Sequence, residues 1–412
     1  MALNYVWLGF FLISFVVAVG RLVFLHDTAV FSTVMNGMFD SAKTGAEISL
    51  GLAGIMTFWL GIMKVGEQGG MISILARWVD PFFSRLFPEI PKKHPAMGSI
   101  LMNFSANALG LDNAATPVGL KAMKQLQELN PEPEVATNAQ IMFLVLNTAG
   151  ITLIPTSVIA LRIAAGSANA ADIFIPTMIG TLISFMSGLL AVALYQRINL
   201  LKAPILIAFA GFGLLLAAIF YLMRLVPSDQ IATYTAFIGG FIIFSVIVSF
   251  LGLAAIKKIN VYDVFIDGAK EGFQVSITII PYLVTMLVAI SAFRNTGCMD
   301  YVLDILRAIF AFTGMNTAFV EALPVGLMKS LSGGAARALM VDILKTHGAD
   351  SFVGRLASII QGSTETTFYV LAVYFGSVNI KKTKYALTCG LIADAVGIIA
   401  AIILAYIFFP LT

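Results

Sequence analysis

The sequence has little charge. Asp, Glu, Lys and Arg make up 11% of its 412 residues, whereas 59% are apolar. A soluble globular protein carries about 25% charged residues, so this chain lacks the ionic surface that water-soluble proteins need. Its mean hydropathy is +0.93, and apolar runs long enough to cross a bilayer recur along it. The composition therefore predicts an all-α membrane protein with several spans and excludes a soluble enzyme.

Residue types that bind metals and cofactors are also scarce. The two cysteines, Cys298 and Cys389, lie far apart in apolar surroundings, and the three histidines share no ligand spacing. The sequence has no phosphate-binding Gly-x4-Gly-Lys-Ser/Thr loop, no Gly-x-Ser-x-Gly elbow and no His-Glu-x-x-His pair. The net charge of +3 contains no basic block. We therefore expect no catalytic residues, no metal, no cofactor and no nucleic-acid partner.

An internal repeat predicts the architecture. Residues 40–49 match residues 267–276 at Asp, Ala, Lys, Gly and Ser, and an apolar span follows each segment. We expect four parts: an N-terminal transmembrane helix at 1–39, a first repeat at 40–195, a two-helix transmembrane linker at 196–266 and a second repeat at 267–412. A cleaved signal peptide is the alternative interpretation of the first apolar segment.

Each repeat is expected to contain one span, an interfacial amphipathic stretch, a re-entrant helical hairpin and two further spans. The odd number of crossings predicts that the repeats are inverted. Lysine placement agrees: the loop at 166–172 has no Lys or Arg, whereas its counterpart at 379–384 has three lysines. One observation disagrees, because the first span needs its N-terminus inside the cell and yet has Arg21 only after it.

Two apolar stretches are interrupted by turn residues, at 110–117 and at 330–334. We expect each to form two short helices that meet inside the membrane, with Asp112, Asn113, Thr116 and Ser332 at the starts of the second helices. Interrupted helices at this depth survive only when buried or lining a cavity, and in inverted-repeat transporters they bind substrate or ion. A packing turn without a ligand is the alternative.

Polar side chains also lie within helical stretches. Asn103 and Asn107 form an amide pair on one helix face, and Asn147 and Thr148 stand opposite residues 360–362 of the second repeat. Such residues bind a substrate, or they hold neighbouring helices together.

The strongest cluster is in the second repeat. Gln361, Thr364, Glu365 and Phe368 are spaced to share one face of a continuous helix at 356–375. An ionisable residue within a span is costly to insert and must face protein or water. Glu365 is therefore expected to bind a substrate or a coupling cation, or else to form an ion pair with Arg294, Arg337 or Lys329. The full candidate set is Asn103, Asn107, Asn113, Thr116, Asn147, Thr148, Ser332, Gln361, Ser363, Thr364, Glu365 and Thr366, and Asp394 is a weaker candidate.

These motifs resemble known families. Asn-Ala-Ala-Thr-Pro-Val-Gly-Leu-Lys-Ala-Met at 113–123 is similar to the signature of spore maturation protein A. Gln-Gly-Ser-Thr-Glu-Thr-Thr-Phe-Tyr at 361–369, with segments 281–284, 332–334 and 347–352, resembles spore maturation protein B. The chain thus looks like a fusion of the two within the nucleoside recognition, or gate-domain, group. Gly-Ser-Thr-Glu at 362–365 resembles the Gly-Gln-Thr-Glu element of nucleoside transporters, with Ser363 in place of glutamine.

From these patterns we expect a bacterial inner-membrane permease for a small polar solute, nucleoside-like or envelope-related. The expected partners are the lipid bilayer, that solute, a coupling cation and further copies of the chain. The alternative from another class is a non-transporting membrane factor that acts through partners in envelope or spore-cortex maturation.

Overall fold

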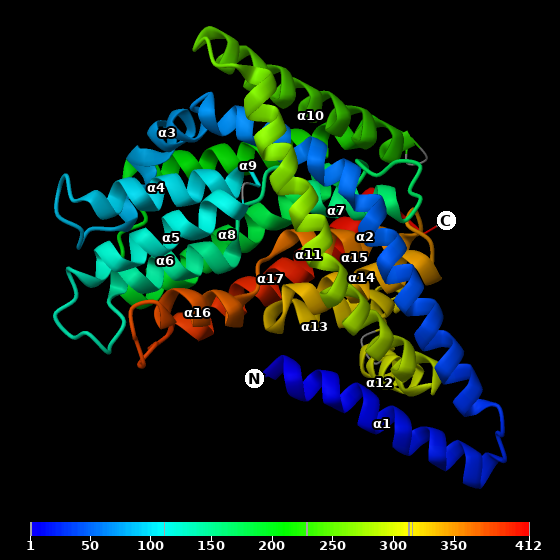
Figure 1. Cartoon of the computed structure of the whole chain (residues 1–412). Coiled ribbons are helices and arrows are strands. Elements are labelled where there is room, and N and C mark those ends of the chain that lie inside the picture. The colour runs from blue at the N-terminus through cyan, green and yellow to red at the C-terminus, as the bar shows by residue number, and fades with distance from the viewer. Residues whose placement is uncertain (1, 111, 228–229, 312–313, 315, 412) are drawn as a thin grey trace.

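The computed structural model describes residues 2–411 except 111, 228–229, 312–313 and 315. These residues form helices joined by short loops, as Figure 1 shows. An N-terminal helix, α1 (Ala2–Leu25), lies along the edge of the molecule beside α12. The predicted all-α class is confirmed.

The first half of the chain follows α1. Its helices are α2 (Val30–Gln68), α3 (Met71–Leu86), α4 (Pro95–Ala108), α5 (Asp112–Gln127), α6 (Asn138–Ala149), α7 (Thr156–Ala164) and α8 (Phe174–Gln196). Helices α9 (Ala203–Arg224) and α10 (Ile231–Ile256) then connect it to the second half. Local sequence explains several boundaries: Pro95 starts α4, and Thr137 with Gln140 forms a capping box at the start of α6.

The second half has the same order of elements. Its helices are α11 (Val261–Asn295), α12 (Cys298–Ala311), α13 (Leu323–Leu331), α14 (Gly333–Thr346), α15 (Phe352–Ser363), α16 (Thr367–Gly376) and α17 (Ala386–Phe408), and a 3-10 turn, Ala318–Ala322, precedes α13. Each half thus contains a long helix, an amphipathic helix, a helical hairpin, a broken helix and a final long helix.

The two halves pack along matching elements. The long helices α2 and α11 lie side by side, and α8 packs against α17. Close approach requires small residues: a Cβ on Gly272 of α11 would lie 2.3 Å from the backbone oxygen of Met56 in α2. The core of the molecule is therefore shared between the halves.

Loops that are not equivalent in the repeat meet between the halves. The loop between α5 and α6 contacts the loop between α16 and α17, where the backbone N–H of Lys382 donates to the Glu134 carbonyl over 2.9 Å. The loop between α7 and α8 contacts the loop between α14 and α15 through Ala168 and Asp350. In each half, the loop that follows the hairpin therefore contacts the loop that follows the broken helix of the other half.

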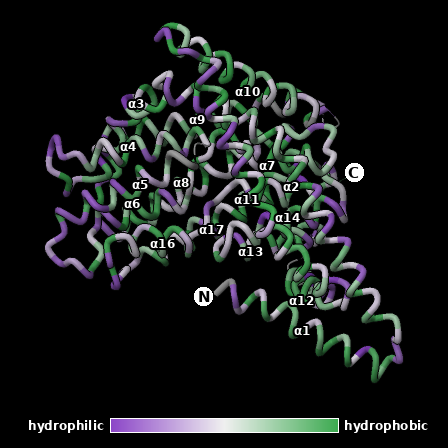
Figure 2. Tube along the Cα trace, in the orientation of Figure 1, coloured by the Kyte–Doolittle hydropathy of each residue, from purple (hydrophilic) through white to green (hydrophobic). Residues whose placement is uncertain are grey.

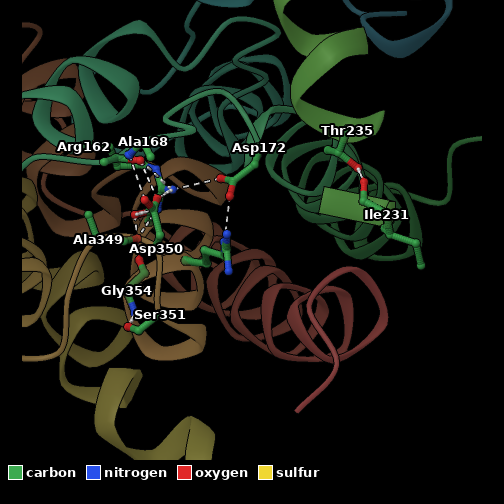
Figure 3. Close-up of polar contacts among 12 residues, drawn as sticks. Arg162, Ala168, Asp172, Ile231, Thr235, Ala349, Asp350, Ser351 and Gly354 are labelled. Atoms are coloured by element: carbon green, nitrogen blue, oxygen red, sulfur yellow. Dashed lines mark hydrogen bonds and ion pairs between the residues drawn. The ribbon is translucent and has the colours of Figure 1, made fainter. Parts of the chain in front are cut away.

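The second of these loop contacts contains a buried ionic network (Figure 3). Arg162 and Asp172 form an ion pair of 2.9 Å, and both side chains are 0% exposed. Arg162 also donates to the backbone oxygen of Ala349 and pairs with Asp350, and Arg355 pairs with Asp172 over 2.7 Å. Residues from both halves thus neutralise one another inside the protein.

Asp350 has a pKa below its usual range. Burial alone would raise the pKa of its carboxyl group, but hydrogen bonds from the Ser167 hydroxyl and the Ala168 N–H, together with the Arg162 charge, lower it further than burial raises it. The carboxylate form of Asp350 is therefore the form that the loop contact stabilises.

Seven helices among the described residues are long and apolar enough to cross a membrane: α1, α2, α8, α9, α10, α11 and α17. Helices α1, α9 and α10 are largely exposed, and Figure 2 shows hydrophobic residues along them. These surfaces suit contact with lipid. The stretch at 356–375, expected as one continuous span, is instead broken into α15 and α16.

Candidate functional site

Each half contains one helix that breaks within an apolar stretch. In the first half α6 ends at Ala149 and α7 begins at Thr156, and Pro155 directly precedes α7. In the second half α15 ends at Ser363 and α16 begins at Thr367, with extended backbone at Thr364. Both breaks leave helix ends inside the protein, where backbone groups need other partners.

The two breaks contact each other. The backbone N–H of Glu365 donates to the carbonyl oxygen of Thr148 over 3.0 Å. Gly150 has a φ of +38°, and a Cβ at this position would lie 2.5 Å from Cγ of Glu365. Glycine at 150 therefore provides both the backbone conformation and the space for the Glu365 side chain.

Each helical hairpin meets the break of its own half. In the first half the Leu153 N–H donates to the Ala108 carbonyl at the end of α4, over 2.9 Å. In the second half Gly333 lies against Thr366, such that an added Cβ would stand 2.6 Å from Oγ1 of Thr366. Ser332 caps α14 by accepting from the Ala335 N–H over 3.2 Å. Two hairpin ends and two broken helices thus form one contiguous arrangement.

Three predicted amides form a network in the first half. Asn107 donates to Asn103 over 3.4 Å and to Asn147 over 3.0 Å. Asn103 donates to the backbone oxygen of Ala115, and the Tyr374 hydroxyl of α16 donates to Asn147 over 3.4 Å. The void among these side chains is about 10 Å³, which is about the space of one water. The amides therefore join the first hairpin to broken helices of both halves.

Helices α8 and α17 add polar groups around the breaks. Thr181 of α8 donates to the Gly150 carbonyl, and Thr367 donates to Asp394 of α17 over 2.8 Å. Both Gln361 Oε1 and Thr364 Oγ1 are buried without a hydrogen-bond partner among the described atoms. Buried polar atoms without partners are rare, and two of them lie here next to a break.

Two sequence predictions are wrong. Gln361, Thr364, Glu365 and Phe368 do not share one helix face, because the chain is extended at Thr364 and a new helix begins at Thr367. The two β-branched threonines of the extended segment, Thr364 and Thr366, favour extended backbone over helix. Thr116 does not begin a helix either, since α5 starts at Asp112, which is another of the expected start residues. The side chain of Asn113 lies outside the described residues.

Glu365 is half-buried, and no ion pair connects its carboxylate to another described residue. Arg294, one of its three expected partners, is paired with Asp342 instead. Arg337 has neither a hydrogen bond nor an ion pair to another described residue and lines a separate cavity. The carboxylate therefore lies at the crossing of the breaks and is not paired with Arg294 or Arg337.

The predicted residues divide between two cavities in the described part of the chain. A cavity of about 620 Å³ is lined by Ser332 alone of the predicted set, and Asn103, Asn107 and Asn147 line the small void. The sequence analysis also missed Tyr374, which lies seven residues after Thr367 and hence near the same helix face. A tyrosine in an apolar helix needs a hydrogen-bond partner, and that signal could have identified it.

Comparisons with known proteins agree with this organisation. The profile of the nucleoside recognition family, Gate, matches residues 49–165 and 276–381, which together are more than half of the chain. Spore maturation protein B of Bacillus subtilis (strain 168) is 46% identical over 164 residues, which cover 40% of this chain and 90% of that protein. Spore maturation protein A of the same organism is 44% identical over 187 residues, 45% of this chain and 92% of that protein.

A shorter match exists to a membrane protein. Inner membrane protein YjiG of Escherichia coli (strain K12) is 38% identical over 77 residues, which cover 18% of this chain and 49% of that protein. With the seven apolar helices, these similarities identify a bacterial membrane protein with several spans.

Proposed function

This chain belongs to the nucleoside recognition (Gate) family and is a fusion of sequences similar to spore maturation proteins A and B, and on that premise we propose that it is a secondary transporter for a small polar solute. The binding site is placed where the two broken helices cross. Glu365 and Thr148 mark this crossing.

The observation that carries the proposal is the contact between the breaks. Discontinuous helices cost backbone hydrogen bonds, and membrane proteins tolerate them where they line a path or bind a ligand. Here two of them meet at Glu365, whose carboxylate has no ion-pair partner among the described residues. An unpaired carboxylate beside free helix ends can accept hydrogen bonds from a solute or bind a coupling cation.

The contacts between loops support inverted repeats. In a parallel repeat the equivalent loops of the two halves would lie on the same side of the membrane. Instead, the loop after the first hairpin, with Glu134, contacts the loop after the second broken helix, with Lys382. The loop with Ala168 contacts the loop with Asp350 in the reciprocal way. Two inverted units around one site are the arrangement that alternating access uses.

A second candidate function rests on the relatives' names. Two of them are called spore maturation proteins, and a non-transporting factor in envelope or spore maturation is compatible with that name. Such a factor would use its polar core for stability, and the amide network around Asn107 fits this role. The two functions differ in whether a solute binds and crosses the membrane.

A ligand-dependent thermal-shift screen tests the proposal. The purified protein is heated with nucleosides, amino acids, divalent metals and cell-wall precursors, and any stabilising compound is then measured for uptake into proteoliposomes. Glu47→Gln, a change of an exposed glutamate on α2, is the matched control for Glu365→Gln. Stabilisation and uptake that require Glu365 support transport. Stabilisation without uptake supports the second function.

A further inference from the structure

A cavity lies beside the end of the second hairpin. It has a volume of about 620 Å³ and lies between α1, α11 and the start of α14. Its apolar walls include Trp7, Tyr282 and Met286. Cavities of 300–1,000 Å³ accommodate small organic molecules, so this one exceeds the size of a bare ion.

One cation faces this apolar space. Arg337, in the second turn of α14, lines the cavity and is half-buried. No hydrogen bond or ion pair joins its guanidinium to another described residue, whereas Arg294 on the neighbouring helix is paired with Asp342. Arginine in an apolar helical bundle normally pairs, because an unpaired charge is costly there. The cavity therefore has a positive charge without its counter-ion.

The start of α14 adds to this positive potential. Ser332 and Gly334 line the cavity at the N-terminal end of the helix, where the dipole favours anions. The Ser332 hydroxyl accepts from the Ala335 N–H, and the other N–H groups of the first turn have no acceptor within the helix. Arg337 is one turn further along the same helix, so an acid group can contact both.

We propose that this cavity binds an organic anion that carries one carboxylate or phosphate group on an apolar or aromatic body. Arg337 holds the acid group by charge-assisted hydrogen bonds, and Trp7 and Tyr282 contact the apolar body. Either a soluble organic anion or the headgroup of an anionic lipid supplies this chemistry. This proposal does not rest on the proposed transport, because its test measures only the binding of an anion.

The test uses the full chain in phosphatidylcholine nanodiscs, which contain no anionic lipid. Equilibrium dialysis measures the binding of 1-naphthyl phosphate and of uncharged 1-naphthylmethanol. We expect the wild type to prefer the phosphate, Arg337→Gln to weaken its binding at least about tenfold, and Arg337→Lys to restore part of the affinity. Arg224→Gln, which removes an exposed arginine at the end of α9, is the matched control and should bind as the wild type does.

A second variant keeps the charge and removes the space. A Cβ at Gly334 meets nothing nearer than Ser332 Oγ at 4.0 Å, so Gly334→Leu places its side chain in open space and should abolish binding even if Arg337→Gln fails to fold. Native mass spectrometry from phosphatidylglycerol nanodiscs identifies the source. If phosphatidylglycerol stays bound to the wild type and is lost from Arg337→Gln, the ligand is a lipid headgroup. If phosphatidylglycerol does not compete with 1-naphthyl phosphate for the cavity, the ligand is a soluble anion. The proposal is overturned if the wild type and both variants bind 1-naphthyl phosphate equally and retain phosphatidylglycerol equally.

Discussion

The backbone N–H of Glu365 donates to the carbonyl oxygen of Thr148 and so connects the broken helix of one half to the broken helix of the other. Both groups are free to pair because the helices end there: the helix containing Thr148 stops at Ala149, and Glu365 lies between two helices. A single backbone bond therefore links the two positions at which the membrane-embedded chain is discontinuous.

The first prediction concerns Glu365. Replacement by glutamine retains its size and hydrogen bonding but removes a charge that has no ion-pair partner among the described residues. Glu365→Gln should therefore unfold at the wild-type temperature and lose its stabilisation by the ligand found in the thermal-shift screen. A destabilised Glu365→Gln that recovers when Lys329 or Arg337 is neutralised would instead assign the carboxylate to a structural ion pair.

The second prediction concerns the contact of the second hairpin with the second break. Gly333→Ala puts a methyl group 2.6 Å from Oγ1 of the buried Thr366, and overpacking of this kind costs about 1–3 kcal/mol. The unfolding temperature of the detergent-solubilised protein measures it. Gly334→Ala, whose methyl group meets open space, is the control. Adding Thr366→Ala should restore stability to Gly333→Ala, and an equal loss in the double variant would contradict the contact.

The third prediction concerns the buried network. Arg162→Met leaves the buried carboxylate of Asp172 with Arg355 as its remaining cation. Removing one partner of a buried pair costs about 3–5 kcal/mol, so this variant should unfold at a much lower temperature. Lys381→Met removes an exposed partner of Glu134 and should cost less than about 1 kcal/mol. Equal effects of the two substitutions would show that the network contributes no more than a surface pair.

The fourth prediction concerns pH. Because Asp350 has a lowered pKa in the folded protein, the unfolded state binds more protons below the usual aspartate pKa of about 4. The stability from this carboxylate is therefore fully present above about pH 4 and is lost as the pH falls through the lower folded value. Unfolding temperatures measured from pH 6 downward should fall less steeply in Asp350→Asn than in the wild type. Parallel curves would contradict this assignment.

The fifth prediction concerns topology. The inverted arrangement places the exposed residues Asn169 and Lys382, which occupy equivalent loops, on opposite sides of the membrane. With Cys298 and Cys389 replaced by alanine, Asn169→Cys should react with an impermeant maleimide on intact cells, and Lys382→Cys only after permeabilisation. Labelling of both on intact cells would contradict the inverted repeat.

The sequence predicted the helical class and the positions of both hairpins, because turn residues inside apolar stretches are local signals. The interruption at 330–334 corresponds to the end of α13 and the start of α14 at Ser332. The break at Thr364 was missed because the polar residues 361–367 were assigned to one helix with the apolar residues on either side. The contacts that stabilise the extended segment come from distant residues such as Thr148. The partner of Arg294 could not be predicted either, since Asp342 approaches it only after the long helix α11 packs against α14.

The network around Arg162 bears on how the chain enters the membrane. Arg162 and Asp172 belong to the first half and form an ion pair, while Asp350 and Arg355 of the second half carry opposite charges and each pair with one of these two residues. During synthesis the first half can therefore enter the bilayer without an uncompensated charge at this position, since Asp350 follows Asp172 by more than 170 residues. Asp350 and Arg355 then add to the pair of Arg162 and Asp172 when the halves meet. Two separately encoded halves could assemble by the same route, since neither has to wait for the other to become electrically neutral at this position.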